Sequence, residues 1–308
     1  MNEFLNIGVI GLGVMGQRML ARLAGHARLR PVSVWDADPA AVARTLLSYP
    51  HLRAAASAEA LIAEPGLHSL YIATPPAPHM ALSQLGFDAG LAVFCEKPLT
   101  VDFAAARACI ARIEAQGQRA AVNFALASSP GLALLLALAR EDWRAVELDV
   151  SFANWPRPWQ AAAGAWLAER LEGGFSREVL SHFIFVLQRV LGPAQVLSSA
   201  VGYPEDGRSA ETALRAELVV GDVTVQINGK VGGEIADQNR MLWRAGGSEV
   251  ELRQWFSEIE QRGRETQTPP QIDQLDQWAA LIEGRPHSLP GYAEALAVQE
   301  TIEALLRS

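Results

Sequence analysis

A glycine-rich turn lies near the amino terminus, directly between an apolar run and an amphipathic segment. Leu5 to Ile10 has the composition of a buried strand, and the sequence Gly11-Leu12-Gly13-Val14-Met15-Gly16 follows without a break. Residues 17–24 then place apolar side chains at helical spacing. A strand, a GxGxxG turn and a helix in this order are typical of a dinucleotide-binding unit. The glycines allow a tight turn, close approach of a pyrophosphate and packing of the helix on the strand.

Asp36 strengthens this interpretation because it ends the next predicted strand, Pro31 to Trp35. It lies 25 residues after Gly11, near the ~20 residues that separate such a turn from the acid that binds the adenosine ribose. A carboxylate there accepts hydrogen bonds from the ribose hydroxyls and repels a 2′-phosphate. We therefore expect NAD, with NADP disfavoured. The alternative is that Asp36 only begins a turn or caps the helix near Pro39.

Strand-like and helix-like segments continue to alternate as far as Asn123. After the first two strands the predicted elements are a helix at 39–47, a strand at 67–73, a helix at 80–89, a strand at 91–95, a helix at 104–116 and a strand at 119–122. This alternation predicts a parallel sheet. Ligands of such sheets bind beyond the carboxyl ends of the strands. The cofactor candidates at those ends, beside the turn residues 11–16, are Thr74, Pro75, His79, Glu96 and Asn123.

Lys97 lies at the end of the strand predicted at 91–95, between Glu96 and Pro98. A lysine beside a nucleotide cofactor can hydrogen-bond a reacting hydroxyl or carbonyl, which makes Lys97 a candidate catalytic residue. The alternative is a solvated surface lysine.

Three motifs, in this order and spacing, resemble the Gfo/Idh/MocA oxidoreductases, the relatives of glucose–fructose oxidoreductase and inositol dehydrogenase. They are Gly11 to Gly16, then Ala73-Thr74-Pro75-Pro76 with His79, then Glu96-Lys97-Pro98. The resemblance runs through the whole first domain. It implies an N-terminal Rossmann domain with a doubly wound parallel sheet, a C-terminal α/β domain with a largely antiparallel open sheet, and NAD(P). It also implies a cis peptide bond before Pro98.

After Asn123 the pattern changes, and strands predominate. Predicted strands cover residues 145–152, 213–220, 223–231, 238–245 and 248–255. Gly221-Asp222 and Gly246-Gly247 join two pairs of them as tight hairpins, which indicates an antiparallel sheet. Helices are predicted at 273–282 and 293–306. We expect two domains: a cofactor-binding domain over 1–122 and a domain for substrate binding and oligomerisation over 123–308.

A further helix is predicted over Arg177 to Leu191, with Ser176 as its cap and Gly192-Pro193 as its end. Its polar side carries Glu178 and His182, four residues apart and so on one face. Periodicity alone favours a solvated polar face. The element Gly173-Gly174, an acid and then His182 is similar, however, to the Gly-Gly…Asp-x-x-x-His element of the same family. The resemblance implies that His182 is the general acid/base and that Glu178 accompanies it.

Two departures from the family pattern bear on the substrate. Glu178 is one methylene longer than the Asp found in many members, and Phe185 stands where many have a second Asp. A sugar or polyol substrate is therefore less secure.

The loop Asn154-Trp155-Pro156-Arg157-Pro158-Trp159 leaves the first strand of the second domain. Its aromatic rings are suited to stacking on a ligand, with Arg157 binding a carboxylate or phosphate. This makes Trp155 and Arg157 substrate candidates beside Lys97 and His182. Packing at a subunit contact is the equal alternative.

Composition narrows the possible partners and compartment. The chain has 308 residues and a formal net charge of −8, which argues against nucleic acid and anionic membranes as partners. Its two cysteines, Cys95 and Cys109, lack metal-ligand spacing and fit a reducing compartment. No signal peptide is visible in residues 1–4, and no apolar run approaches the ~20 residues of a membrane span. We expect a cytoplasmic protein without a metal site.

These observations favour hydride transfer between a nicotinamide and a small hydroxyl or carbonyl compound, such as a sugar, a polyol or a related acid. Lys97 and His182 would be the acid/base pair. One alternative is an NAD-dependent glycoside-cleaving enzyme, and another is a non-catalytic nucleotide sensor. An open sheet needs its outer face covered, so a homodimer or homotetramer through the second sheet is expected.

Overall fold

The computed structural model describes residues 4–269 and 272–307, apart from the side chains of residues 161–163. Residues 1–3, part of the segment examined above for a signal peptide, lie outside this range. The chain divides into two compact units, 1–124 with 273–296, and 125–272 with 297–308. This division differs from the predicted domains at two points: the boundary falls after residue 124 instead of 122, and Asp273–Leu296, predicted in the second domain, packs with the first unit.

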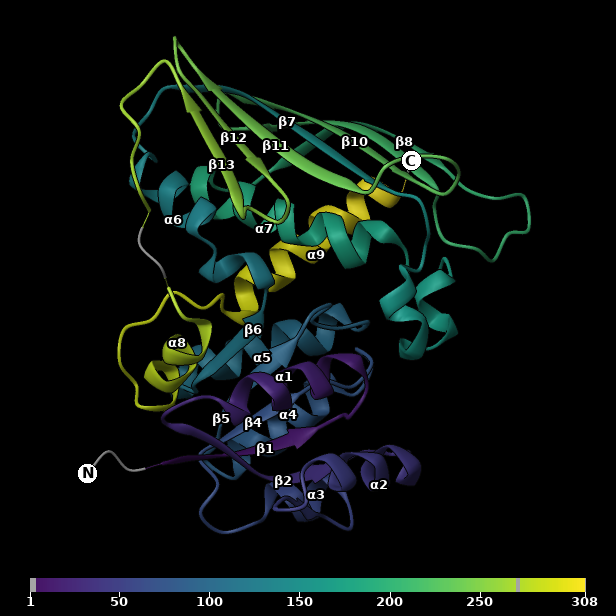
Figure 1. Cartoon of the computed structure of the whole chain (residues 1–308), viewed down its shortest axis with the longest axis vertical. Helices are drawn as coiled ribbons and strands as arrows, with labels where there is room; N and C mark the ends of the chain where they lie inside the picture. Colours follow the sequence, from purple (N-terminus) through teal and green to yellow (C-terminus); the bar gives the residue numbers. More distant parts are fainter. Residues whose placement is uncertain (1–3, 270–271, 308) are drawn as a thin grey trace. The chain divides into compact units, whose positions relative to one another are not determined.

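The first unit contains a six-stranded, fully parallel sheet in the order β3-β2-β1-β4-β5-β6 (Figure 1). Dinucleotide-binding sheets of the Rossmann type have this strand order. The strands are β1 (Leu5–Ile10), β2 (Leu29–Trp35), β3 (Arg53–Ala54), β4 (Ser69–Ile72), β5 (Ala92–Glu96) and β6 (Ala120–Asn123). The helices between them are α1 (Val14–Ala24), α2 (Pro39–Ser48), α3 (Ala58–Ile62), α4 (His79–Asp88) and α5 (Phe103–Gln116). The parallel sheet and the cis bond between Lys97 and Pro98 are as predicted.

Local sequence explains where several of these helices begin and end. The side chains of Asp38, Ser57 and Asp102 accept hydrogen bonds from backbone N–H groups in the first turns of α2, α3 and α5. Gly117 ends α5 in the left-handed region. Short β3 and α3 were not predicted, because neither is long enough to show a period.

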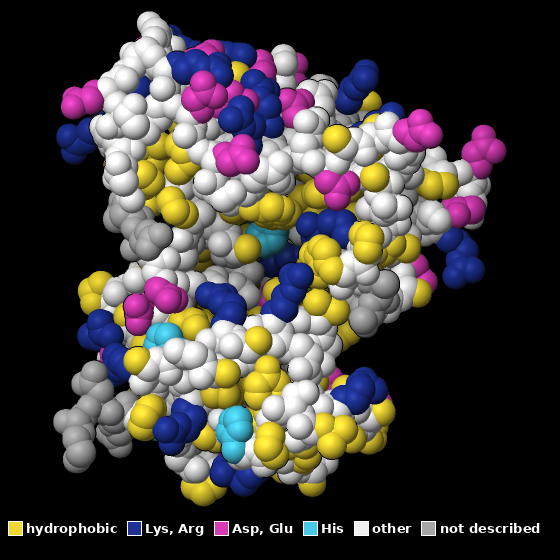
Figure 2. All heavy atoms as spheres, in the orientation of Figure 1, with side chains coloured by type: hydrophobic (Ala, Val, Ile, Leu, Met, Phe, Trp, Pro, Cys, Tyr) yellow, Lys and Arg dark blue, Asp and Glu magenta, His cyan; other side chains and the backbone are white. Residues whose placement is uncertain are grey.

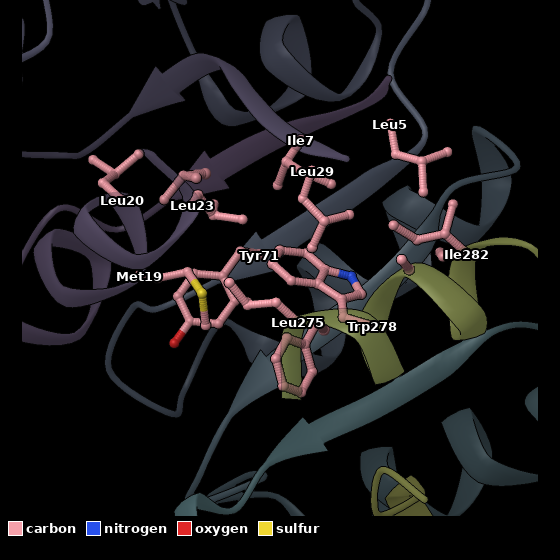
Figure 3. Packing of buried hydrophobic residues seen from close by; sticks show 14 of the residues in the cluster. Leu5, Ile7, Met19, Leu20, Leu23, Leu29, Tyr71, Leu275, Trp278 and Ile282 are labelled. Atoms are coloured by element: carbon pink, nitrogen blue, oxygen red, sulfur yellow. The ribbon is translucent and has the colours of Figure 1, made fainter. Parts of the chain in front are cut away.

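A late segment of the chain completes the core of the first unit. Helix α8 (Gln274–Ile282) packs Trp278 against Tyr71 of β4 (Figure 3) and against Phe94 of β5, and the ring centroids are 5.8 and 5.0 Å apart. The indole N–H donates to the Ser69 hydroxyl at 3.0 Å. Trp278 is fully buried. These contacts explain why 273–296 belongs with the first unit, since Ser69 precedes Trp278 by 209 positions.

The second unit is built on a seven-stranded sheet in the order β13-β12-β11-β7-β10-β9-β8. The strands are β7 (Trp143–Phe152), β8 (Gln195–Gly202), β9 (Ala213–Val220), β10 (Val223–Val231), β11 (Gln238–Ala245), β12 (Glu249–Arg253) and β13 (Glu258–Arg262). Every neighbouring pair is antiparallel except β7 with β10, so the largely antiparallel sheet is confirmed. Both predicted hairpins are present, because Val220 pairs with Val223 and Arg244 with Glu249.

The helical elements of this unit include α6 (Pro130–Ala137), α7 (Ser181–Leu191) and most of α9 (Tyr292–Leu306). Four short helical turns accompany them, at Ala125–Ser128, Pro158–Ala163, Ala165–Ala168 and Ser176–Leu180. The last is a π-helical turn that runs directly into α7. The helix predicted over Arg177–Leu191 therefore begins in π geometry and becomes regular only at Ser181.

The two faces of the second sheet differ in polarity. Buried and exposed residues alternate along the whole of β10, as expected for a strand with one solvated face. On the outer face Arg240 binds Asp149 and Glu251 at 3.0 and 2.7 Å, and Arg244 binds Glu249 at 3.0 Å. Cationic and acidic side chains intermix over the ends of β11 to β13 (Figure 2).

No helix in the described part of the chain is long and apolar enough to span a bilayer.

Candidate functional site

The glycine turn of the first unit fits its strand and helix tightly at two positions and is open at a third. A Cβ on Gly11, whose φ is +93°, would lie 2.5 Å from the Ala73 backbone, and one on Gly16 would lie 2.0 Å from the Gly11 carbonyl oxygen. Gly13 has nothing within 4 Å of its Cβ position. The turn therefore packs closely against β4 and presents an unobstructed backbone at Gly13.

Asp36 is half-buried and organises this turn. Its Oδ2 accepts the Leu12 N–H at 2.6 Å and its Oδ1 accepts the Asp38 N–H at 2.8 Å. The carboxylate is thus fixed at the end of β2, beside the turn, as the sequence predicted. Each oxygen keeps further lone pairs for a ligand.

These residues fit a dinucleotide. Helix α1 begins at Val14 and Met15 without a side-chain cap, so its first N–H groups are available to an anion. The Thr74 hydroxyl, at the end of β4, is buried without a hydrogen-bond partner, as a group awaiting a ligand would be. A pyrophosphate at Gly13 and ribose hydroxyls at Asp36 would use the donors and acceptors that the turn supplies.

His79 is held between two loops at the ends of the strands. It is fully buried, and its two ring nitrogens lie 3.2 and 2.9 Å from the backbone oxygens of Leu99 and Thr74. Burial lowers the pKa of this imidazole. The side chain therefore ties the loop after β4 to the loop after β5, and Pro75 lies exposed in the first of these loops.

Glu96 is the centre of a buried hydrogen-bond network. Its Oε1 accepts from the Tyr71 hydroxyl and from Asn123 Nδ2, the latter at 2.6 Å, and its Oε2 accepts the Lys97 N–H at 3.3 Å. Asn123 Oδ1 in turn accepts from Gln274 of α8 at 2.7 Å. Burial, followed by the charge of Glu96, raises the pKa of Tyr71 well above its ordinary value. The Asn123 side chain is thus engaged within the protein, and the network fixes the backbone that carries Lys97.

The polar arc predicted on the helix of the second unit is buried. Glu178 is 9% exposed and His182 7% exposed, and Phe185 is also buried. The solvated-face interpretation is therefore wrong. Glu178 lies in the π-helical turn and His182 in the first turn of α7. Turns of this kind are frequent at functional sites.

Glu211 is a buried residue of this region that the sequence analysis missed. Its Oε1 accepts the Ser176 N–H at 2.7 Å, and Oε2 would lie 2.3 Å from a Cβ on Gly174. Burial raises the pKa of this carboxyl, and hydrogen bonds from Ser176 oppose the rise. Glu211 thus caps the helix that carries Glu178 and His182. The Ser176 cap predicted from sequence is absent, because Phe175 occupies that position and Ser176 is already helical. No motif surrounds Glu211, so the sequence held no signal for it.

The two candidates in the loop after β7 have separate environments. The Trp155 indole N–H donates to the Leu167 carbonyl at 3.0 Å and its ring meets Phe175 edge-on, which is a packing role. The Arg157 guanidinium carbon lies 4.6 Å from the Trp159 ring centroid and 5.1 Å from that of Phe152.

No cluster of three or more His, Cys, Asp or Glu residues in 4–269 and 272–307 is placed to hold a metal ion.

The fold and the turn define a class: a Rossmann-type dinucleotide-binding unit joined to a second unit with an open sheet. Residues 5–124 match the model of an oxidoreductase family with an NAD-binding Rossmann fold, named GFO_IDH_MocA. Residues 5–124 therefore match the NAD-binding domain of the Gfo/Idh/MocA oxidoreductases, the family that the motifs resemble.

Curated relatives match chiefly over this domain. An inositol 2-dehydrogenase of Pseudomonas fluorescens is 34% identical over 123 residues, which cover 37% of this chain and 35% of the relative. One from Rhizobium meliloti is 33% identical over 34% of this chain and 32% of the relative. The chain thus matches about a third of the length of these relatives.

Solved structures match over nearly the whole chain, at identities that establish the fold alone. The WlbA dehydrogenase of Chromobacterium violaceum, in complex with NADH and UDP-GlcNAcA, has a TM-score of 0.85 at 18% identity, covering 99% of this chain and 93% of that one. A putative myo-inositol dehydrogenase of Sinorhizobium meliloti has a TM-score of 0.77 at 19% identity, covering 99% and 97%.

Proposed function

We propose that this protein is an NAD-dependent dehydrogenase or reductase that acts on a small hydroxyl or carbonyl compound, such as a sugar, a polyol or a related acid. The glycine turn with its open Gly13, the fixed Asp36 carboxylate and the Thr74 hydroxyl supply the cofactor contacts. When bound, NAD would accept a hydride from the substrate or return one. A carboxylate at Asp36 favours NAD over NADP.

One observation carries the assignment of Lys97. The chain has two lysines, Lys97 and Lys230, against 24 arginines. Arginine has thus been used at nearly every cationic position, whereas the position after the buried Glu96 keeps an ammonium group. An ammonium is a compact donor that exchanges protons far more readily than a guanidinium. This supports a role for Lys97 in which it hydrogen-bonds the substrate oxygen and stabilises negative charge that develops there.

His182 supplies the proton transfer in this proposal. In the oxidising direction its imidazole takes the proton of the substrate hydroxyl, and in the reducing direction it returns a proton to the carbonyl oxygen. Glu178, one helical turn earlier, orients the imidazole or tunes its proton affinity. Their burial supports these roles, because removing an acid and an imidazole from water costs free energy that contacts within the site must offset.

The test compares the two lysines. Lys97→Ala and Lys97→Arg are expected to lower kcat by about 10²- to 10⁴-fold, measured as NADH formation from a panel of sugars, polyols and hydroxy acids. NAD affinity by calorimetry stays within about threefold, because the cofactor contacts are elsewhere. Lys230→Ala, on the exposed face of β10, is the matched control and keeps full activity. Unchanged turnover in both Lys97 variants would remove Lys97 from the reaction.

Two further proposals concern partners and compartment. Both cysteines are free and buried, which supports a reducing, cytoplasmic setting. We also propose a homodimer or homotetramer that covers the outer face of the second sheet. Sedimentation of the native protein tests this, and a pure monomer at micromolar concentration would contradict it.

A further inference from the structure

The loop between β12 and β13 holds an unusual backbone conformation. Gln254, Trp255 and Phe256 have φ values of 50°, 57° and 66°, three consecutive non-glycine residues in the left-handed region. Such a backbone is strained at each non-glycine residue, so the surrounding structure must enforce the turn. The predicted strand over 248–255 ends at Arg253 for this reason.

Two anchors hold this turn in place. The buried Asn239 accepts the Trp255 N–H through Oδ1 at 2.6 Å, and its backbone oxygen accepts the Gln254 N–H at 3.3 Å. Phe256 is fully buried and packs so closely on Gly131 that a Cβ there would lie 2.7 Å from it. The strain is therefore balanced by contacts on both sides of Trp255.

The turn delivers Trp255 to the candidate proton-transfer residue. The Trp255 ring centroid lies 5.6 Å from that of His182 at an interplanar angle of 84°, and 5.6 Å from that of Phe183. The Trp255 side chain is half-buried, so part of it still faces open space. A strained, anchored turn that keeps a partly exposed indole against a buried imidazole is a built feature of the site.

Arg157 reaches the same indole from the loop after β7. Its guanidinium carbon lies 5.6 Å from the Trp255 ring, as well as near the Trp159 and Phe152 rings. Its Nε donates to Oε1 of the buried Gln160 at 2.9 Å. The contacts with aromatic rings and the hydrogen bond at Nε orient the plane of the guanidinium, and a guanidinium of fixed plane is suited to a carboxylate.

We propose that Trp255 and Arg157 form a specificity site for a carboxylate-bearing, hydroxylated substrate. Arg157 pairs with the carboxylate, and Trp255 packs against the C–H face of the substrate beside His182. The inference rests on the proposed function, because it takes His182 to face the substrate. A cation at this place would attract an anionic ligand locally, although the formal net charge of the chain is −8.

The test measures binding by calorimetry at saturating NAD for three matched pairs: glucuronate and glucose, gluconate and glucitol, tartrate and threitol. We expect at least one acid to bind tenfold or more tightly than its neutral partner. Arg157→Lys keeps the charge but removes the planar fork, and it should weaken that acid about tenfold while changing the neutral partner less than threefold. Arg170→Lys, which removes a comparable guanidinium contact with Tyr203, is the control and should change neither.

Trp255→Phe provides a second measurement, because it removes ring area without touching the charge. It should weaken the acid and its neutral partner by the same few-fold factor, and it carries the test if Arg157→Lys fails to fold. No preference for an acid in any pair, or equal weakening of acid and neutral compound by Arg157→Lys, overturns the proposal. Stronger binding of glucose 6-phosphate than of every acid overturns the carboxylate assignment.

NADH formation, followed in parallel, separates this inference from the proposed function. Selective acid binding that Arg157→Lys abolishes, without NADH from any compound, would support the specificity site and contradict the dehydrogenase. Turnover without a preference for acids would support the dehydrogenase and contradict the specificity site.

Discussion

Each unit of this protein places a glycine turn ahead of a helix that carries candidate site residues, but the two helix starts differ. In the first unit, α1 begins after Gly13 without a side-chain cap, and space around Gly13 is open. In the second unit, the Ser176 N–H is occupied by the buried carboxylate of Glu211, which lies against Gly174. One turn leaves its donors for a ligand, and the other satisfies them with the chain's own acid.

The difference separates two uses of glycine. Gly11, Gly16, Gly173 and Gly174 all leave no room for a Cβ, since the nearest atoms would lie 2.0 to 2.5 Å away. They are packing residues, and their loss should affect stability. Gly13 has no such neighbour, so its loss should affect only what binds there.

Gly16→Ala is expected to have the largest effect on the fold. Its Cβ would lie 2.0 Å from the Gly11 carbonyl oxygen, a backbone atom that cannot move without displacing β1. We expect a loss of about 3 kcal/mol in the free energy of unfolding, measured by urea denaturation. The free energy of unfolding of Gly13→Ala should lie within about 0.5 kcal/mol of the wild-type value, because the Gly13 φ of −69° suits any residue.

The same pair separates stability from cofactor binding. Gly13→Ala should weaken NAD at least tenfold by calorimetry while the protein remains folded, because the methyl group occupies the open backbone surface. A Gly13→Ala protein with normal NAD affinity would show that the cofactor does not approach this turn.

Gly174→Ala should have the next largest effect. Gly174 and Gly192 have nearly equal φ values, 102° and 104°, but a Cβ on Gly174 would lie 2.3 Å from Glu211 whereas one on Gly192 would meet nothing within 4 Å. Backbone strain alone costs about 1 kcal/mol and applies to both. The contact with Glu211 should add about 1–2 kcal/mol at Gly174.

Thermal or urea unfolding of both variants measures this difference directly. Gly192→Ala is the matched control for the φ angle. Equal destabilisation of the two variants would mean that Glu211 gives way easily and does not hold the turn.

The sequence predicted the first unit far better than the second, for a physical reason. Its candidate site residues lie at the ends of consecutive parallel strands, next to the motifs from which they were predicted. The apolar run of β1 was predicted to the residue because a glycine follows it directly. Asp36 and Glu96 were likewise placed correctly at strand ends.

In the second unit, tertiary packing determines which residues are buried and which lie at the candidate site. The arc with Glu178 and His182 looked solvated, yet both side chains are buried, and His182 packs on Trp255, 73 positions later in the chain. Strand β8 was missed because most of its residues are partly or fully exposed and show no alternation. Trp255 was missed because a left-handed turn without glycine or asparagine has no sequence signature. Glu211 and Gln274 act only through residues far away along the chain.

Glu211→Gln should have the smallest effect, and its sign depends on pH. Burial raises the pKa of Glu211 in the folded protein, so the native state holds this proton more tightly than the unfolded chain. The resulting stabilisation is fully present below the ordinary glutamate pKa and is lost as the pH rises through the folded value.

Glutamine keeps an oxygen for the Ser176 N–H but carries no charge to desolvate. Relative to the wild type, Glu211→Gln should therefore gain stability as the pH rises above the ordinary glutamate pKa, measured by urea unfolding between pH 4 and pH 8. A difference in the free energy of unfolding that is the same at every pH would contradict this prediction. It would show that the charge of Glu211 is already balanced and does not change the stability of the second turn.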